Sequence, residues 1–408
     1  MWRRFANKLR CSLCASELSL TVLNEHRVDL DAQYLALANQ QGLSGSDFAT
    51  YVESGLLNCA ACDVSFPIYK GLPVMVPYST SLHEEFVREF VQRLPNGKAT
   101  RFANRDPVQG ERFVLNSFST EWMDYDYDGV IWEMDYADHE RRFLAELGSY
   151  SPSSQCPGMF MELGCGIGIT TYLAQKNFHA DAVGVDLGLG ALRAALRYRD
   201  NPFLHFVQGS VFYLPFAQST FDTIYSRGVL HHTYSTETAF DSLSRFAKPG
   251  GVTYLWVYGP KSINDTLLRR ALFVAEAAVR KLLSGRDDGA LANAVLYPIA
   301  CSYVLFNHGR RLADATIQPY NLRRALHAAR DRFTPEFAHR HSDTEVSAWF
   351  GNANYIDLEV VDWKAMPTAD HDDYRRNTGV RGRKAAVPAI EASPRQVADD
   401  VNVHRSAA

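Results

Sequence analysis

Four cysteines near the start of the sequence have the spacing of a metal site. They form two C-x-x-C pairs, Cys11 with Cys14 and Cys59 with Cys62, and residues 15–58 separate the pairs. Each pair can hold one ion between two thiolates, and two pairs supply the tetrahedral sulfur ligands that zinc prefers. Four protein ligands leave no open coordination position, so we expect a structural zinc. The alternative is four free, buried cysteines.

A glycine-rich turn is the second feature whose spacing suggests chemistry. Residues 159–168, MFMELGCGIG, begin as a buried parallel strand and contain Gly164, Gly166 and Gly168. A helical segment follows. Such a turn alone is weak evidence, because dinucleotide-binding folds use G-x-G-x-x-G in the same place.

Two acidic residues indicate which type of ligand this turn binds. Glu162 precedes Gly164 by two residues, at a position where a nicotinamide site usually has an apolar residue. Asp186 ends the next predicted strand, 18 residues after Gly168. An acid at that place can accept hydrogen bonds from both hydroxyls of a ribose. These positions therefore predict a nucleoside-binding site of a different type from a nicotinamide site.

Two adjacent histidines follow the fourth predicted strand. His231 and His232 lie in residues 226–236, SRGVLHHTYST, and adjacent side chains on a helix point about 100° apart. At most one of them is therefore expected to face a pocket. A histidine can accept a proton near neutral pH. We expect His232 as the candidate general base before His231, with a structural role as the alternative for either residue.

These side chains require a sheet whose strands end at one edge. After the glycine turn, the sequence predicts further strands within residues 180–188, 206–232, 246–259, 354–363 and, as an antiparallel seventh strand, 374–384. Ser342 and Glu345 form an S-x-x-E capping box, which predicts the start of a helix. His339 and His341 precede this helix and are expected on the pocket side.

An apolar insertion is predicted between the fifth and sixth strands, at residues 261–330. On a helix, residues 265–285 form one apolar stripe of Leu268, Leu272, Ala275, Val279 and Leu282. The apolar run at residues 291–306 is shorter than the ~20 residues of a membrane-spanning helix, and Pro298 interrupts it. We expect a substrate lid, with core packing and a membrane-surface role as the alternatives.

Composition excludes several classes of protein. The chain has 408 residues and a formal net charge of −4, which predicts two or three domains and no basic footprint for nucleic acid. No apolar segment follows the basic N-terminus, so no signal peptide and no stable membrane insertion are expected. We expect a cytoplasmic protein, where thiols stay reduced and C-x-x-C pairs are more often metal ligands than disulfides. The oligomeric state is open.

Four segments are predicted along the chain. They are an α+β, zinc-ribbon-like module at residues 1–78, a helical and aromatic linker that covers the pocket at residues 79–150, the α/β domain at residues 151–383, and a disordered tail at residues 384–408.

Two resemblances to known families rest on these motifs. The first 78 residues resemble the short zinc-ribbon proteins that act as methyltransferase activators, on the early cysteine pair and residues 53–77. Residues 115–383 resemble class I methyltransferases that use S-adenosylmethionine, on the ordered motifs from the glycine turn onward. The second resemblance implies a Rossmann-like α/β fold with a seven-stranded sheet, helices on both faces and ligands beyond the strand C-termini.

The same resemblance implies a set of cofactor-binding residues. They are Glu162, Gly164, Cys165, Gly166 and Gly168 at the methionine end, Asp186 and Leu187 at the ribose and adenine, Gly209, Ser210 and Val211 at the adenine edge, and Ser226. Ser210 departs from the family, which commonly has Asp at this position. A serine can accept a hydrogen bond from the adenine amino group but carries no charge, and Cys165 is read as a small packing residue.

The sequence is compatible with three functions. The leading hypothesis is methyl transfer to oxygen or carbon of a small acceptor, and the apolar insertion favours a lipophilic or biosynthetic one. The first alternative is methylation of tRNA or of a translation protein, which the ribbon suggests. The ordinary charge and the absence of an N-P-P-Y motif in residues 226–236 argue against it. The second alternative is a cofactor-binding scaffold without turnover.

Overall fold

The fold is taken from a computed structural model. It describes residues 1–43, 48–94, 100–124, 130–131, 134–152, 158–260, 267–283, 290–313 and 319–386. The predicted disordered tail lies outside the described residues from residue 387 onward, and Lys384 still belongs to a strand.

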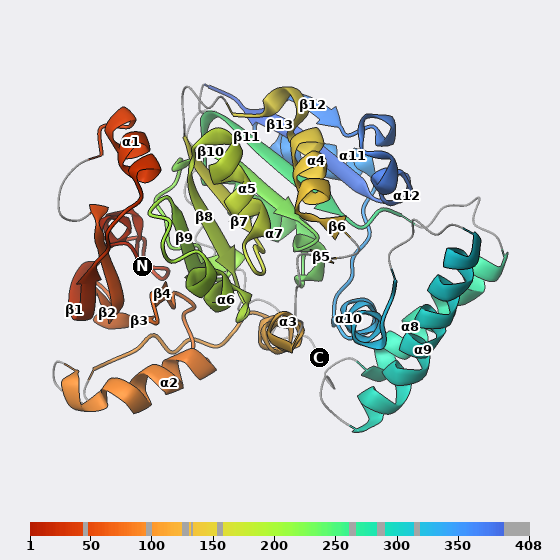
Figure 1. Ribbon diagram of the computed structural model, residues 1–408, viewed down its shortest axis with the longest axis horizontal. Coiled ribbons are helices and arrows are strands. Elements are labelled where there is room, and N and C mark those ends of the chain that lie inside the picture. Colours follow the sequence, from red (N-terminus) through yellow and green to blue (C-terminus); the bar gives the residue numbers. More distant parts are fainter. Residues whose placement is uncertain are drawn as a thin grey trace.

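A seven-stranded sheet forms the centre of the molecule (Figure 1). Its order is β12-β13-β11-β10-β7-β8-β9, and β13 runs antiparallel to both of its neighbours whereas β7 to β11 are parallel. This order confirms the predicted class I methyltransferase fold. The strands are β7 (Met159–Leu163), β8 (Asp181–Asp186), β9 (Leu204–Gln208), β10 (Phe221–Arg227), β11 (Ala247–Val257), β12 (Tyr355–Val360) and β13 (Thr378–Lys384).

Helices cover both faces of this sheet because successive strand residues point to opposite sides. Phe160 and Tyr225 pack on the face covered by α4 (Tyr136–Leu147), α5 (Ile169–Phe178) and α6 (Gly190–Arg197). Met161 and Ile224, their neighbours in sequence, pack with α7 (Thr236–Ser244) and α11 (Asp343–Asn352). The predicted capping box at the start of α11 is confirmed, with the Ser342 hydroxyl accepting from the Glu345 amide.

The front module is a second, antiparallel sheet. Its four strands, β1 (Ser19–Arg27), β2 (Thr50–Cys59), β3 (Val64–Tyr69) and β4 (Leu72–Pro73), lie in sequence order. They are accompanied by a 3-10 helix at Arg3–Lys8, by α1 (Ala32–Gln40) and by α2 (Ser81–Phe90). The module therefore combines strands and helices, as the sequence predicts.

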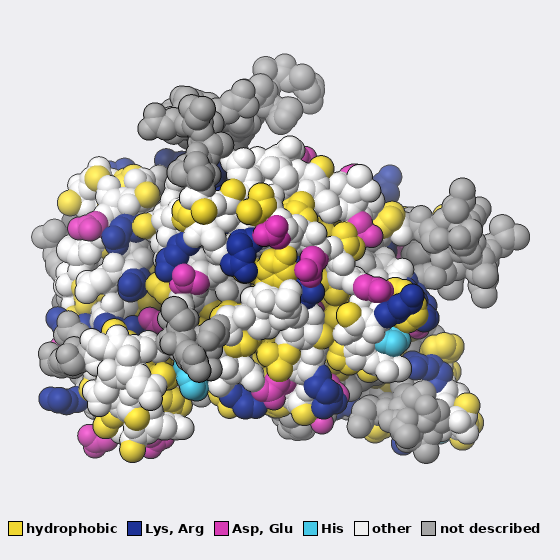
Figure 2. All heavy atoms as spheres, turned by 90° about the horizontal axis from the view of Figure 1, so that it is seen from above, with side chains coloured by type: hydrophobic (Ala, Val, Ile, Leu, Met, Phe, Trp, Pro, Cys, Tyr) yellow, Lys and Arg dark blue, Asp and Glu magenta, His cyan; other side chains and the backbone are white. Residues whose placement is uncertain are grey.

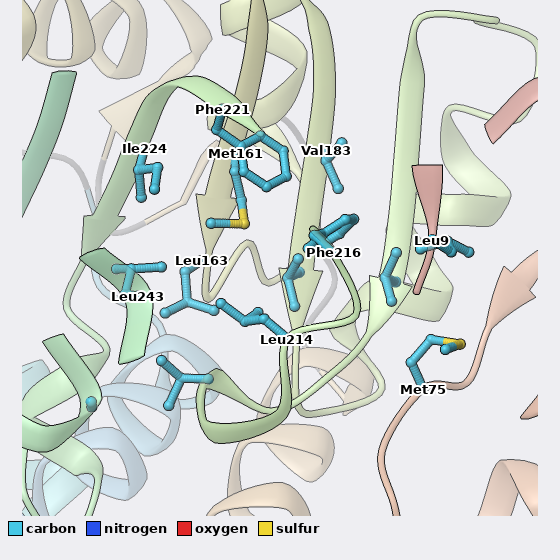
Figure 3. Packing of buried hydrophobic residues seen from close by; sticks show 14 of the residues in the cluster. Leu9, Met75, Met161, Leu163, Val183, Leu214, Phe216, Phe221, Ile224 and Leu243 are labelled. Atoms are coloured by element: carbon cyan, nitrogen blue, oxygen red, sulfur yellow. The ribbon is translucent and has the colours of Figure 1, made fainter. Parts of the chain in front are cut away.

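The front module covers the β9 edge of the central sheet. The Met75 amide donates to the Gln208 carbonyl at 2.8 Å, and the Arg10 amide donates to the Pro215 carbonyl at 2.9 Å. An uncovered edge strand invites pairing with other chains, and these bonds close it. Figure 3 shows Leu9 and Met75 of the module in the same buried cluster as Phe216 of the α/β domain.

An ion pair and an indole strengthen this contact. The Arg4 guanidinium donates two hydrogen bonds to the Asp181 carboxylate, at 2.7 and 2.8 Å. Trp2, almost fully buried, donates from Nε1 to the Asn201 carbonyl at 3.0 Å. Although burial of Asp181 opposes it, the contacts with His205 and Arg4 hold its pKa well below the usual range. The module and the α/β domain thus share one core.

The segment between the module and the α/β domain reaches over the strand ends. It contains α3 (Glu111–Asp124) and a short hairpin, β5 (Val130–Ile131) with β6 (Met134–Asp135). In Figure 1, α3 lies beneath the C-terminal ends of the central strands. This position agrees with a pocket cover.

The predicted insertion is a helical arm that extends from the α/β domain (Figure 1). It consists of α8 (Leu267–Leu283) and α9 (Ala290–Ala313), and α10 (Leu322–Phe333) connects it to the domain. The α9 helix continues through Pro298, so the expected interruption is wrong. Within the described residues, no helix is long and apolar enough to cross a membrane.

The predicted apolar stripe on α8 is mostly exposed where the structure describes its side chains, which does not support the core-packing alternative. Ala275 and Leu282 are exposed, and Val279 is half-buried. The buried positions are Glu276 and Leu283 instead. The side chains of residues 268 and 272 lie outside the described residues. Among the described residues, a small cluster around Leu283 packs the arm, and much of its described apolar surface is in contact with solvent.

Candidate functional site

A cavity of about 580 Å³ lies at the C-terminal ends of the central strands. The ends of β7, β8, β10 and β11, the segment after β9 and the helix α3 all contribute to its lining. Cavities of this size hold nucleotide-like ligands, and such ligands bind beyond the carboxyl ends of the strands in open α/β sheets. The site therefore lies where the sequence predicts it.

The glycine turn opens one wall of the cavity. Gly164 lines the cavity and has φ +75°, and a Cβ atom built on it would lie 2.0 Å from a methyl carbon of Val229. Any other residue at this position would be strained and would collide with that side chain. The missing side chain lets a ligand approach the backbone closely.

Asp186 ends β8 with both carboxylate oxygens anchored. The Gly166 amide donates to Oδ2 at 2.8 Å, and the Gly188 amide donates to Oδ1 at 2.7 Å. An ionised carboxylate can accept about four hydrogen bonds, so these two amides leave the group the chemistry of a multiple acceptor. Asp186 also lines the cavity. Its fixed carboxylate can thus accept both hydroxyls of a ribose.

The far wall holds the predicted adenine-side residues. Leu187, Gly209, Ser210 and Val211 all line the cavity. The Ser210 hydroxyl accepts from the Phe212 amide at 3.1 Å, which fixes its position.

The remaining predicted cofactor residues do not line the cavity. They are Glu162, Cys165, Gly166, Gly168 and Ser226, of which none contributes to the cavity lining. Glu162 accepts from the Thr171 amide and hydroxyl, and burial raises the pKa of Glu162 to about 8. The Ser226 hydroxyl donates to the Leu163 carbonyl. These residues hold the turn in shape from beneath.

Glu111 adds a carboxyl group to the adenine-side wall that sequence reasoning missed. It begins α3, is almost fully buried and lines the cavity. Its carboxyl accepts from the Val108 amide at 3.1 Å and lies against the hydroxyls of Ser210 and Tyr78. Burial raises the pKa of Glu111, whereas the Ser210 contact opposes that shift. No local motif surrounds this residue, so only the fold identifies it.

The opposite end of the cavity carries paired charges that also had no sequence signal. Arg227 donates from Nε to Glu146 at 2.9 Å and from a terminal nitrogen to Asp373 at 2.5 Å, and its guanidinium lies over Trp256. Despite its burial, the acids Asp373 and Glu146 raise the pKa of Arg227 well above its ordinary value. The guanidinium thus stays charged at the cavity wall.

A second ion pair lies beside the first. Arg142 of α4 approaches Asp370 at 3.5 Å, and both line the cavity. The Oδ2 atom of Asp370 is buried and has no hydrogen-bond partner among the described residues. A buried acceptor without a partner carries a desolvation cost that a ligand donor would remove. This end of the cavity is therefore suited to a polar group.

The two histidines occupy different environments. His232 lines the cavity, whereas His231 lies outside the lining and stacks on Tyr258 at 3.9 Å between ring centroids. The Nδ1 atom of His232 lies 2.8 Å from the Phe337 carbonyl. A carbonyl only accepts, so Nδ1 carries the proton and Nε2 keeps its lone pair. Burial lowers the pKa of His232 to about 4, which keeps the ring neutral.

Two other expected pocket histidines lie elsewhere. His341 contacts the Thr236 hydroxyl at 2.9 Å, and the His339 amide donates to the His231 carbonyl. Neither contributes to the described cavity lining, so this expectation is wrong. They support the loop that carries Phe337, and that carbonyl orients His232.

The four cysteines of the front module converge. Their sulfur atoms all lie within 4.8 Å of one another, with Cys14 and Cys59 at 3.5 Å and Cys11 and Cys62 at 4.0 Å. A tetrahedral zinc with Zn–S bonds of 2.3 Å separates its sulfurs by about 3.8 Å, so the observed spacing fits.

The backbone around each cysteine pair supports the same interpretation. The residues directly after the second cysteines, Ala15 and Asp63, both have positive φ, at 60° and 52°. This conformation turns the backbone sharply after each cysteine pair. The Cys62 amide also approaches the Cys59 sulfur at 3.4 Å, and such contacts stabilise thiolates that bind a metal.

Comparisons with known proteins agree with this geometry. Residues 161–255 match the family model described as a methyltransferase domain. The chain is 22% identical over 230 residues to a phosphoethanolamine N-methyltransferase from Caenorhabditis elegans, covering 55% of this chain and 50% of that protein. It is 29% identical over 225 residues to a sterol 24-C-methyltransferase from Gibberella zeae, covering 50% of this chain and 58% of that protein.

A solved structure is also similar. It is the Haemonchus contortus phosphoethanolamine N-methyltransferase 2 in complex with phosphomonomethylethanolamine and S-adenosylhomocysteine, which is 15% identical and has a TM-score of 0.40. The match covers 69% of this chain and 62% of that chain. The chain spans about half the length of the curated relatives named above. The residues that match the family model belong to the central α/β domain.

Proposed function

We propose that this chain, whose central segment is a methyltransferase domain, transfers a methyl group from S-adenosylmethionine to a small acceptor. The observation that carries the proposal is the anchored Asp186 carboxylate beside the open Gly164 turn at the strand ends. Together they supply a ribose acceptor and a close backbone approach in a cavity of suitable size. The cofactor, when bound, supplies an already activated methyl group.

We place the adenine of the cofactor against the far wall of the cavity. Leu187 covers the ring and the segment Gly209 to Val211 borders its edge in this proposal. Glu111 supplies the carboxyl that Ser210 lacks, because both line the same wall and lie against each other. Glu111→Ala is therefore expected to weaken cofactor binding about tenfold, and Glu111→Gln less, since an amide oxygen still accepts.

The acceptor end combines polar and apolar walls. Arg227, Asp373 and Asp370 offer charges, whereas Trp256 and Tyr258 offer rings. The curated relatives act on different acceptors, including a phosphoethanolamine and a sterol by their names. We retain oxygen or carbon of a small, lipophilic or biosynthetic molecule as the target. The unpartnered Asp370 oxygen favours an acceptor that carries a hydrogen-bond donor.

His232 is proposed as the group that orients the acceptor or takes its proton. Nδ1 is committed to the Phe337 carbonyl, which leaves Nε2 as the available acceptor. His232→Ala should lower turnover about 10²–10⁴-fold while cofactor affinity and melting temperature change little. His231→Ala is the matched control, because His231 lies outside the cavity lining and should retain most activity.

The front module is proposed to hold one structural zinc through Cys11, Cys14, Cys59 and Cys62. The distances between the sulfurs and the two sharp turns support this assignment. Zinc bound by four thiolates has no open position for catalysis, so its contribution is to folding.

The activity is tested by incubating the protein with S-adenosylmethionine labelled in its methyl group and an extract of small molecules. Mass spectrometry should detect labelled products in the organic or aqueous fraction. The label should be lost with Gly164→Val, which blocks the turn. Label that appears only in added tRNA or in a protein fraction would instead support the macromolecular alternative. Cofactor binding without any labelled product would support a scaffold.

A further inference from the structure

The arm formed by α8 and α9 carries the most exposed apolar surface of the described residues. Val274, Leu305, Phe306 and Leu312 are between 70% and 81% exposed, and the other exposed large apolar side chains that the structure describes are all below 50%. Contiguous apolar surface of this kind marks an interaction site.

The exposed residues of α9 form one continuous stripe. Leu291, Pro298, Leu305 and Leu312 are all exposed and follow each other at intervals of seven residues. Positions seven apart lie on nearly the same side of an α-helix, because two turns contain 7.2 residues. From Leu291 to Leu312 the stripe extends over roughly 32 Å of this 24-residue helix, at 1.5 Å per residue.

Positive charge accompanies this stripe. The insertion at residues 261–330 contains eleven Lys or Arg and five Asp or Glu, a net charge of +6 in a chain whose total is −4. The α9 helix contains no acid and ends with the exposed Arg310 and Arg311. Glu276, the single acid of α8, is buried between Arg280 and Arg332. On the face shown in Figure 2, in contrast, cations and acids are interspersed.

We propose that the α8–α9 arm docks on the surface of an anionic lipid bilayer. An apolar helical face flanked by cations is the pattern of helices that lie in the bilayer interface. A second copy of the chain fits less well, because it would bring two arms of net charge +6 together. Anionic headgroups compensate that charge.

The helix α10, which links the arm to the domain, contacts α3 at the candidate active site. His327 of α10 packs its ring against Trp122 of α3 at 6.1 Å, and Thr334 shares a hydrogen bond with Ser117 of α3 at 2.8 Å. Trp122 lines the cavity. Docking would therefore place the cavity cover close to the membrane surface. The docking itself does not depend on the proposed methyl transfer, and its test needs no turnover.

The experiment is co-sedimentation of the full-length protein with vesicles. One set contains phosphatidylcholine and phosphatidylglycerol at about two to one, and the other contains phosphatidylcholine alone. The protein should bind the anionic vesicles and release from them as salt rises, because salt screens the cations. The triple variant Leu305→Glu, Phe306→Glu, Leu312→Glu should bind at least about tenfold less.

A matched control variant introduces the same three negative charges outside the arm. The triple variant Leu35→Glu, Leu196→Glu, Ile356→Glu replaces exposed apolar residues outside the arm and should bind like the wild type. Melting temperatures of both variants confirm that they fold. Wild-type protein that stays in the supernatant, or equal loss in both variants, overturns the proposal. A dimer that the arm variant abolishes, without vesicle binding by the wild type, assigns the face to a second copy instead.

Discussion

The front module and the helical arm are both additions to the same α/β sheet, but they are attached in opposite ways. The module closes the β9 edge with backbone hydrogen bonds and buries Trp2, Leu9 and Met75 against the domain. Among the described residues, the arm has a small core of its own around Leu283, and its helix α9 is largely exposed. An added segment that shares the core contributes to stability, whereas one that extends into solvent is available for binding.

Among the predicted changes, the removal of a metal ligand from the front module should lower stability the most. Cys59→Ser should abolish zinc binding and lower the free energy of unfolding by at least about 4 kcal/mol, because metal binding is coupled to folding. The shared core predicts one unfolding transition for module and domain together. Elemental analysis and calorimetry measure both effects.

The control for this variant is Cys301→Ser, which removes an exposed thiol from the arm. It should keep the metal content and the melting temperature. A separate low-temperature transition in Cys59→Ser, with the α/β domain unchanged, would show that the module unfolds independently.

A pair of phenylalanine truncations compares the two additions directly. Phe66 in β3 is fully buried, and Phe306 in α9 is 70% exposed. Phe66→Ala should cost about 3–5 kcal/mol of unfolding free energy, because it leaves a cavity in the shared core. Phe306→Ala should change it by less than about 0.5 kcal/mol. Similar costs at the two positions, measured by denaturant titration, would contradict the contrast.

Acidification should destabilise the module and the domain through buried histidines. Burial lowers the pKa of His83 and of His232 to about 4. Both rings are neutral in the folded state, and protons bind the unfolded chain more readily below its ordinary pKa of about 6.5. The stability present above that pH is thus lost as the pH falls toward 4, on the order of 1–2 kcal/mol for each ring at pH 5.

Unfolding measured between pH 7.5 and about pH 5 tests this dependence. His83→Asn should flatten the profile, because it removes one of the titrating rings. A pH profile of stability that is the same in the wild type and in His83→Asn would contradict the buried, neutral assignment of His83.

The features that the sequence predicted correctly depend on residues close together in the chain. The glycine turn, the strand that ends at Asp186 and the capping box at Ser342 each lie within a few residues, so their patterns are visible without the fold. The seven-stranded sheet with one antiparallel strand also followed, because the ordered motifs resemble class I methyltransferases, but the order of the strands in the sheet came from the structure. The cysteine pairs are local, and their doubled spacing implied that they converge.

The features that the sequence missed depend on contacts between distant segments. Glu111 reaches the cavity from a helix outside the matched domain, and Asp370 reaches it from the segment after β12. The exposure of the apolar stripe on α8 could not be predicted, because helical periodicity gives the faces of a helix but not which face meets the protein. Leu282 is exposed and Leu283 is buried, and only the tertiary packing distinguishes them.

The most direct test of the account is calorimetric titration of the wild type and of Asp186→Ala with S-adenosylhomocysteine. The variant removes a carboxylate whose two oxygens are aligned by backbone amides at the cavity wall. Hydrogen bonds to a charged group are worth roughly 1.5–3 kcal/mol each, so the affinity should fall at least about tenfold while the melting temperature of the free protein changes little. Wild-type protein that gives no binding signal with S-adenosylhomocysteine, yet binds NADH tightly, would contradict the assignment of the site.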